Sequence, residues 1–120
     1  MNLQWSGVAA IATVSENNAS EHWRKRHSRT LSQKKQVWAF LNKEKPRPSM
    51  PCHIQLTRLS PRMLDSDNLQ GALKYIRDSV ADYLIPGLQP GRADGDTRLS
   101  WSYSQEKAKT KGIRISFFDP

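Results

Sequence analysis

Residues 52–84 read CHIQLTRLSPRMLDSDNLQGALKYIRDSVADYL, and this stretch decides the fold. Alternate residues from Cys52 to Leu56 are apolar, which is typical of a half-buried strand. From Leu69 onward the apolar residues recur at steps of three and four, which indicates an amphipathic helix that begins near Asp67 or Asn68. The change of period predicts a strand, a turn and a helix in succession.

The flanking segments add four further elements. Residues 3–14 are apolar and partly β-branched, and they suggest a strand interrupted at Gly7. Ser32 is suited to cap a helix that runs to about Lys45. Residues 98–104 and 112–118 each alternate and predict a terminal hairpin. The resulting order predicts an α+β fold, in which two main helices pack on a small mixed β-sheet.

The composition restricts the class of protein. A chain of 120 residues forms one compact domain, which we place over 1–120. The net charge of +8 favours a polyanionic partner such as nucleic acid. The single cysteine, Cys52, excludes an intrachain disulfide and fits a reducing compartment, so we expect a cytoplasmic protein. No apolar run approaches the length of a membrane span, and the sequence has no signal peptide or pattern for an organic cofactor.

Asp65 and Asp67 lie between the predicted strand and helix of residues 52–84. Residues two apart in an extended segment project to the same side, so both carboxylates can face one point. Mg²⁺ and Mn²⁺ prefer such oxygen ligands. The alternative is a helix N-terminus, where an aspartate caps the helix and complements its dipole. Local sequence alone slightly favours the cap.

A second acidic pair, Asp94 and Asp96, follows a loop rich in Pro and Gly. An ordinary turn at Gly95 explains the pair equally well. If the strand that follows lies beside the strand from Cys52 to Leu59, Asp96 can complete a cluster of three carboxylates. On that condition, the sequence predicts a cluster of Asp65, Asp67 and Asp96.

Lys and Arg concentrate between Arg24 and Arg47, as expected of a surface that follows a phosphate backbone. The lysines of 107–111 offer a second contact, and three tryptophans offer faces on which unpaired bases can stack, although core or dimer packing explains two of them better. The basic residues expected to contact DNA are Arg24, Lys25, Arg26, Arg29, Lys34 and Lys35, and the tryptophans are Trp23, Trp38 and Trp101.

The order of these features resembles the RusA-type Holliday-junction resolvases, which are small endodeoxyribonucleases found largely in phages and prophages. The specific part is the run Asp-Ser-Asp-Asn-Leu-Gln over 65–70, at a strand-to-helix junction. The run Ser-Glu-Asn-Asn over 15–18, with His22 and basic residues after it, and Asp96-Thr-Arg-Leu99 follow in the family's order. The likeness extends over most of the chain.

The resemblance implies a homodimer that nicks the two opposed strands of a four-way junction with Mg²⁺ or Mn²⁺, in DNA recombination and repair. The family's metal-binding aspartates carry over onto Asp65, Asp67 and Asp96, with Asp94 as the alternative to Asp96. Asn17 and Asn18 carry over as DNA contacts.

One position departs from the family pattern. Gly71 stands where the family usually has a lysine after the Asp-Asn-Leu-Gln run. Lys74, three residues later, is a substitute as a catalytic cation or else an ordinary surface lysine. His22, His27 and His53 form no pattern for a general base or a zinc site. The departure leaves two hypotheses: a metal-dependent junction nuclease, and a non-catalytic nucleic-acid-binding protein with the same fold. A basic scaffold for an acidic protein is a third.

Overall fold

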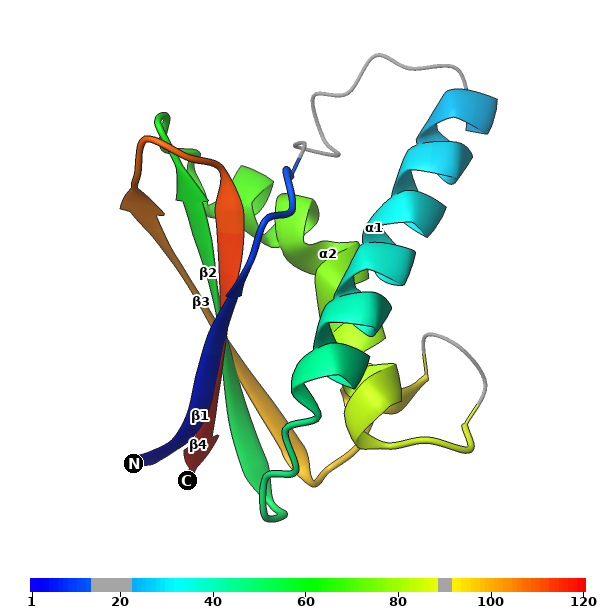
Figure 1. Cartoon of the computed structure of the whole chain (residues 1–120), viewed down its shortest axis with the longest axis vertical. Coiled ribbons are helices and arrows are strands. Elements are labelled where there is room, and N and C mark those ends of the chain that lie inside the picture. Colours follow the sequence, from blue (N-terminus) through cyan, green and yellow to red (C-terminus); the bar gives the residue numbers. More distant parts are fainter. Residues whose placement is uncertain (14–22, 89–91) are drawn as a thin grey trace.

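The computed structural model describes residues 1–13, 23–88 and 92–120, without the side chains of Trp23 and Arg26. Figure 1 shows a four-stranded sheet with two α-helices on one side. The elements are β1 (Asn2–Ala9), α1 (Trp23–Glu44), β2 (Cys52–Ser60), α2 (Ser66–Leu84), the short 3₁₀ helix η1 (Ala93–Gly95), β3 (Leu99–Lys107) and β4 (Gly112–Asp119).

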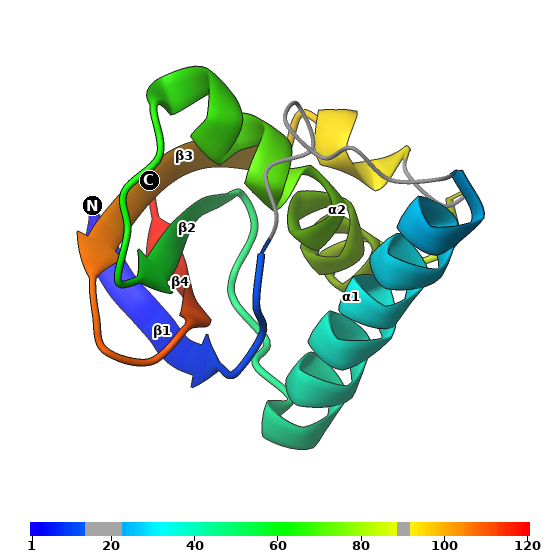
Figure 2. The ribbon, with the colours of Figure 1, turned by 90° about the horizontal axis from the view of Figure 1, so that it is seen from above.

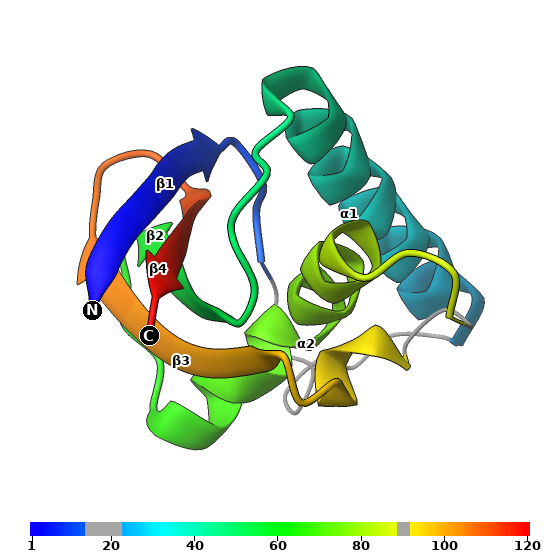
Figure 3. The ribbon, with the colours of Figure 1, turned by 90° about the horizontal axis from the view of Figure 1, so that it is seen from below.

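The strands lie in the order β1-β4-β2-β3. β4 pairs antiparallel with both β1 and β2, whereas β2 and β3 are parallel. A parallel pair needs a crossover connection, and α2 provides it. Views from above and below show that α1 and α2 lie on the same side of the sheet (Figures 2 and 3). The mixed sheet with two packed helices confirms the predicted α+β fold.

The core lies between the helices and the facing side of the sheet. Ile54 and Leu56 of β2 and Leu73 and Ile76 of α2 are fully buried, as their periods of two and of three to four predict. Ile113, Ile115 and Phe117 of β4 are buried as well. The opposite side of the sheet carries serine, threonine and histidine side chains that hydrogen-bond across strands.

The boundaries of two predicted elements were wrong. The first strand ends at Ala9 and passes through Gly7. The first helix begins at Trp23, so Ser32 lies inside it and caps nothing. The segment from Trp23 to Ser32 is basic and has few apolar residues, and therefore carries little of the periodic signal that marks a helix.

The predicted terminal hairpin is also wrong. β3 and β4 are both present, but β2 lies between them in the sheet. The crossover through α2 places β3 parallel to β2 at the edge, and the chain then passes the end of β2 before β4 begins. The backbone N–H of Ala108 in this connection donates to the Ser60 carbonyl at 3.0 Å.

Among the described residues, neither α1 nor α2 is both long and apolar enough to cross a membrane.

Candidate functional site

The start of α2 holds Asp65 in a defined position. Asp65 is the N-cap, with φ −70° and ψ 169°, and its Oδ1 accepts the backbone N–H of Asn68 at 2.9 Å. Gln105 of β3 fixes the preceding residue, because it accepts the N–H of Leu64 at 2.9 Å and donates to the Leu64 carbonyl. The cap hydrogen bond confirms the cap interpretation for Asp65, and one carboxylate oxygen remains outside it.

Asp67 lies in the first turn of the same helix, and both Asp65 and Asp67 are exposed. Carboxylates at this position complement the positive end of the helix dipole. They also present oxygen atoms to solvent within two residues of each other. Mg²⁺ typically takes one or two protein carboxylates and completes its coordination with waters and substrate phosphates. Asp67 lies inside α2 rather than in an extended segment, so the expectation that the two side chains project to one side does not hold, and what the two carboxylates share is their exposure at the helix start.

The connection between β3 and β4 places lysines at the same end of the sheet. It runs beside Ser60, the last residue of β2. Lys109 and Lys111 line an open hollow of about 340 Å³ there, together with apolar side chains of β1 and β2, and Lys107 lies next to it. The end of the sheet that carries the aspartates thus also carries cations that can contact phosphate.

Arg58 is a buried cation near this end, and sequence reasoning missed it. Its Nε donates to Thr13 Oγ1 at 3.0 Å and its Nη1 to the Arg62 carbonyl at 2.6 Å. Burial lowers the pKa of its guanidinium. Within the described part of the chain, no carboxylate forms an ion pair with it. Arg58 follows Ile54 and Leu56 at steps of two along β2, so its side chain points to the side of the sheet that the helices cover. This spacing is the feature of the sequence from which its burial could have been predicted.

The expected cluster of three carboxylates does not form within one chain. β3 does lie beside β2, but the two strands are parallel, with Leu99 opposite Cys52. Asp96 therefore lies at the start of β2 and Asp65 beyond its end, a separation of about 30 Å along a nine-residue strand. Figure 1 shows the starts of α2 and of β3 at opposite ends of the sheet. Among residues 1–13, 23–88 and 92–120, no group of three metal-ligating side chains occurs.

Asp96 is instead engaged by Arg98. Its Oδ1 accepts the backbone N–H and the Nε–H of Arg98, and its Oδ2 accepts from Nη2 at 2.9 Å. These hydrogen bonds lower the pKa of Asp96 from 3.8 to about 2. A carboxylate whose two oxygens bind one guanidinium is a structural ion pair rather than an open metal ligand.

Asp94, the alternative third ligand, is paired with Arg77 of α2 at 3.2 Å. Arg77 also donates to the Tyr103 hydroxyl at 3.0 Å. The neighbouring Asp78 is half-buried, and burial, with the charge of Asp94, raises its pKa. These residues form a network at the C-terminal half of α2, away from Asp65 and Asp67.

Lys74 does not occupy the place of the missing lysine. It is exposed on α2, with its Nζ 5.5 Å from the centre of the Tyr75 ring. At the rise per residue of an α-helix, Lys74 lies about 13 Å beyond Asp65 along the axis of α2. Gly71, the position that usually holds the lysine, is partly buried in the second turn.

The predicted DNA-contacting residues fall mostly on α1, which carries seven Lys and Arg against one Glu. Arg24, Lys25 and Lys35 are exposed, and Arg29 and Lys34 are partly buried. Asn17, Asn18 and His22 lie outside the described residues, as does the side chain of Arg26.

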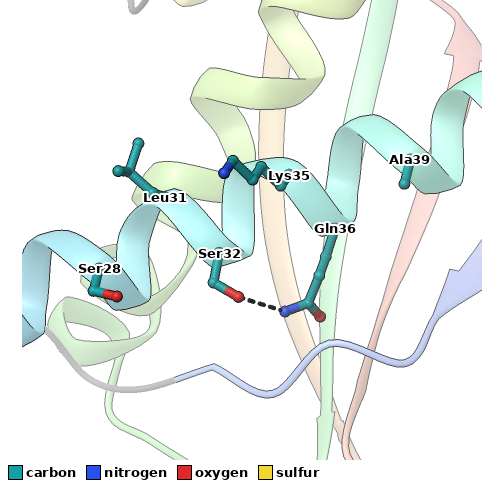
Figure 4. Close-up of a pocket in the computed structure, with 6 residues that line it drawn as sticks. All are labelled: Ser28, Leu31, Ser32, Lys35, Gln36 and Ala39. Carbon is teal, nitrogen blue, oxygen red and sulfur yellow. Dashed lines mark hydrogen bonds between the residues drawn. The ribbon is translucent and has the colours of Figure 1, made fainter.

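The outward side of α1 is hollowed. An open depression of about 430 Å³ is lined by Ser28, Leu31, Ser32, Lys35, Gln36 and Ala39, and the Ser32 hydroxyl accepts from Gln36 Nε2 at 3.1 Å (Figure 4). The figure shows Leu31 and Lys35 pointing away from the helix axis, beside the Ser32–Gln36 pair.

The remaining candidates have structural partners. His53 lies on the open side of the sheet, and its ring nitrogens are each 2.8 Å from a serine hydroxyl, of Ser100 and Ser102. Trp101 packs against the core and donates its Nε1–H to the Asp94 carbonyl at 3.1 Å. Trp38, in contrast, is exposed on α1. The sequence matches no protein-family model and no curated protein.

Proposed function

We propose that this protein binds branched DNA and nicks it with a divalent metal ion held by Asp65 and Asp67, as a structure-specific endonuclease that acts as a two-fold homodimer. The observation that carries the proposal is the pair of exposed carboxylates fixed at the start of α2, at the end of the sheet that also carries the lysines of 107–111. The RusA-type pattern of residues 65–70 supports it.

The chain's own residues would contribute positioning and charge. The Asp65 cap and the Gln105–Leu64 hydrogen bonds hold Asp65 and the start of α2 in place before a ligand binds. Mg²⁺ bound there would activate a water and neutralise charge on the leaving oxygen. Lys109 and Lys111 would hold DNA phosphates at the same end, and the basic residues of α1 would follow the backbone further away. A four-way junction has two-fold symmetry, which a two-fold dimer matches.

A non-catalytic nucleic-acid-binding protein is the second candidate. The hydrogen bond that Asp65 accepts from the Asn68 N–H, the ion pair of Asp96 and the glycine at position 71 favour it. In that case Asp65 serves as a cap only, and the net charge of +8 accounts for DNA binding without chemistry.

Cleavage of a synthetic four-way junction in Mg²⁺ or Mn²⁺ separates the two candidates. Wild type is expected to place one nick in each of two opposed strands. Asp67→Asn and Asp65→Asn should each lower the cleavage rate by at least roughly 100-fold, since even groups that only orient metal ligands typically cost roughly 10- to 100-fold when removed. Junction affinity in EDTA should change little.

Asp65→Asn is informative because asparagine caps a helix about as well as aspartate. The variant keeps the fold and removes only the charge. Asp119→Asn is the matched control, since Asp119 is exposed at the far end of the sheet. Junction binding without cleavage by the wild type in either metal would refute the nuclease and establish the second candidate.

A further inference from the structure

Trp38 leaves 51% of its surface exposed on α1, next to a hollow of about 310 Å³ between α1 and α2. Tryptophan is enriched among the residues that contribute most to binding surfaces, so an exposed indole beside a hollow is a candidate contact. The hollow is lined by Leu31, Lys34, Lys35 and Trp38 of α1 and by Ser79 and Asp82 of α2.

The indole of Trp38 is held in place from behind. Tyr83 of α2 contacts it edge to face, with ring centres 6.2 Å apart and an interplanar angle of 76°. The Tyr83 hydroxyl donates to the Pro46 carbonyl at 2.8 Å and accepts from Arg47 Nη1 at 2.6 Å. Trp38 therefore rests on a buried, hydrogen-bonded residue, and a ligand that stacks on it loses little to ordering of the site.

The charges around the hollow are mixed. Lys35 is exposed at the rim. Lys34 lies 5.5 Å from the centre of the Tyr75 ring and also interacts with Asp78, so its charge is partly balanced. Asp82 places a carboxylate on the α2 side. A complementary ligand has a flat ring for Trp38, an anionic group for Lys35 and an amino group for Asp82.

We infer that the hollow binds an unpaired nucleobase of single-stranded DNA. The base stacks on Trp38, its phosphate contacts Lys35 and Lys34, and its exocyclic amino group donates to Asp82, as carboxylates accept from cytosine N4. Thymine has no such amino group. The inference relies on the proposed function only in taking DNA as the ligand.

The chemistry of the hollow separates a nucleobase from an acidic peptide, whose acidic side chains offer neither a hydrogen-bond donor for Asp82 nor a flat ring for Trp38. Charge alone does not exclude a second copy of the chain, since a two-fold interface can pair a lysine of one copy with an aspartate of the other. The test therefore includes the oligomeric state. Asp82 lies about 25 Å from Asp65 along α2 at the rise of an α-helix. The hollow is therefore separate from the aspartate pair.

The test is fluorescence anisotropy of labelled oligonucleotides in EDTA, where no cleavage occurs. Trp38→Ala should weaken binding to a single-stranded dC oligonucleotide by roughly 5- to 100-fold, the range found when a stacking residue is replaced by alanine. Binding to a blunt duplex should change by less than about twofold. Trp38→Phe keeps a ring and should bind within about threefold of wild type.

Leu88→Ala is the matched control, since Leu88 has a similar exposure of 50% outside the hollow. Wild type should prefer dC over dT oligonucleotides, and Asp82→Asn should abolish that preference. Lys35→Ala should reduce the slope of log affinity against log salt concentration by about 1, as expected for the loss of one phosphate contact. Circular dichroism verifies that each variant is folded.

Two results would overturn the inference. One is a folded Trp38→Ala variant that binds the dC oligonucleotide as tightly as wild type. The other is a Trp38→Ala variant with half the wild-type mass in sedimentation, which would assign the surface to a second copy. Neither depends on cleavage: a protein that binds single strands through Trp38 but nicks nothing refutes only the nuclease.

Discussion

The two ends of α2 carry similar residues in opposite surroundings. At the N-terminal end Asp65 and Asp67 are exposed, and Asp65 accepts the backbone N–H of Asn68. At the C-terminal half Asp78 is half-buried beside Asp94, Arg77 and Lys34. The carboxylates at the first end are exposed, whereas those at the second are held among cations of their own chain.

This difference shows which carboxylates can serve a ligand. An aspartate engaged by a guanidinium must give up that partner before it binds a metal ion, as Asp94 and Asp96 would. An aspartate that caps a helix with one oxygen keeps the other available. The carboxylates at the C-terminal half of α2 therefore have structural roles, and the metal ion that we propose is assigned to its start.

The largest effect is expected at the C-terminal end. Tyr83→Phe should lower the free energy of unfolding by about 1–3 kcal/mol, because it leaves the buried Pro46 carbonyl without its donor and removes the acceptor of Arg47. Urea denaturation measures it. Tyr75→Phe is the control: Tyr75 is half-buried on the same helix, and no hydrogen bond of its hydroxyl is found within the described residues, so the expected change is below about 0.5 kcal/mol. Equal losses would mean that the Tyr83 hydrogen bonds contribute nothing specific.

A smaller effect is expected at the N-terminal end. Asp65→Ala should lower the free energy of unfolding by about 1 kcal/mol, which is typical when an N-cap side chain is removed. Asp65→Asn should lower it by only about a few tenths of a kcal/mol. The same denaturation experiment compares the two variants. If Asp65→Asn destabilises as much as Asp65→Ala, the charge itself stabilises the fold, and the separation of cap from metal ligand fails.

The sequence predicted α2 and β2 well because their patterns reflect burial. Leu69, Leu73 and Ile76 follow the helical period, and Cys52, Ile54 and Leu56 follow the strand period. Each pattern is local, so it needs no knowledge of the neighbouring elements. The aspartate at a strand-to-helix junction could be placed for the same reason.

The position of Asp96 could not be predicted in that way. Its distance from Asp65 depends on whether β3 runs parallel or antiparallel to β2, and alternation within a strand is the same in both cases. The assumed hairpin of β3 and β4 was wrong for the same reason, since the order of strands is a property of the whole sheet. The start of α1 was missed because its first turns lack a buried stripe.

The pH dependence of stability tests the C-terminal half further. Burial and Asp94 raise the pKa of Asp78, while Lys34, Arg77 and Lys74 oppose the shift. The folded state therefore holds the Asp78 proton more tightly than the unfolded chain, and the contribution of Asp78 to the free energy of unfolding should fall as the pH rises through the carboxyl range. In Asp78→Asn this fall should be smaller, so the free energy of unfolding of the variant relative to wild type should increase from pH 3 to pH 7. If the stability of the variant relative to wild type decreases over that interval, the neighbouring cations outweigh the effect of burial on the pKa of Asp78.

The titration of Asp96 tests its ion pair directly. Carboxyl-carbon NMR should place this titration near pH 2, and Arg98→Gln should return it toward the ordinary aspartate range, because the hydrogen bonds of Arg98 lower this pKa.

The smallest perturbation is the binding of a metal ion to the folded protein. Sub-stoichiometric Mn²⁺ should broaden the NMR signals of Asp65 and Asp67 and leave that of Asp96 sharp, since within one chain about 30 Å of strand separates them. Equal broadening of all three signals would mean that the two ends of the sheet meet, which requires a second copy of the chain to bring its Asp96 to the start of α2. The metal site would then belong to the dimer rather than to one chain.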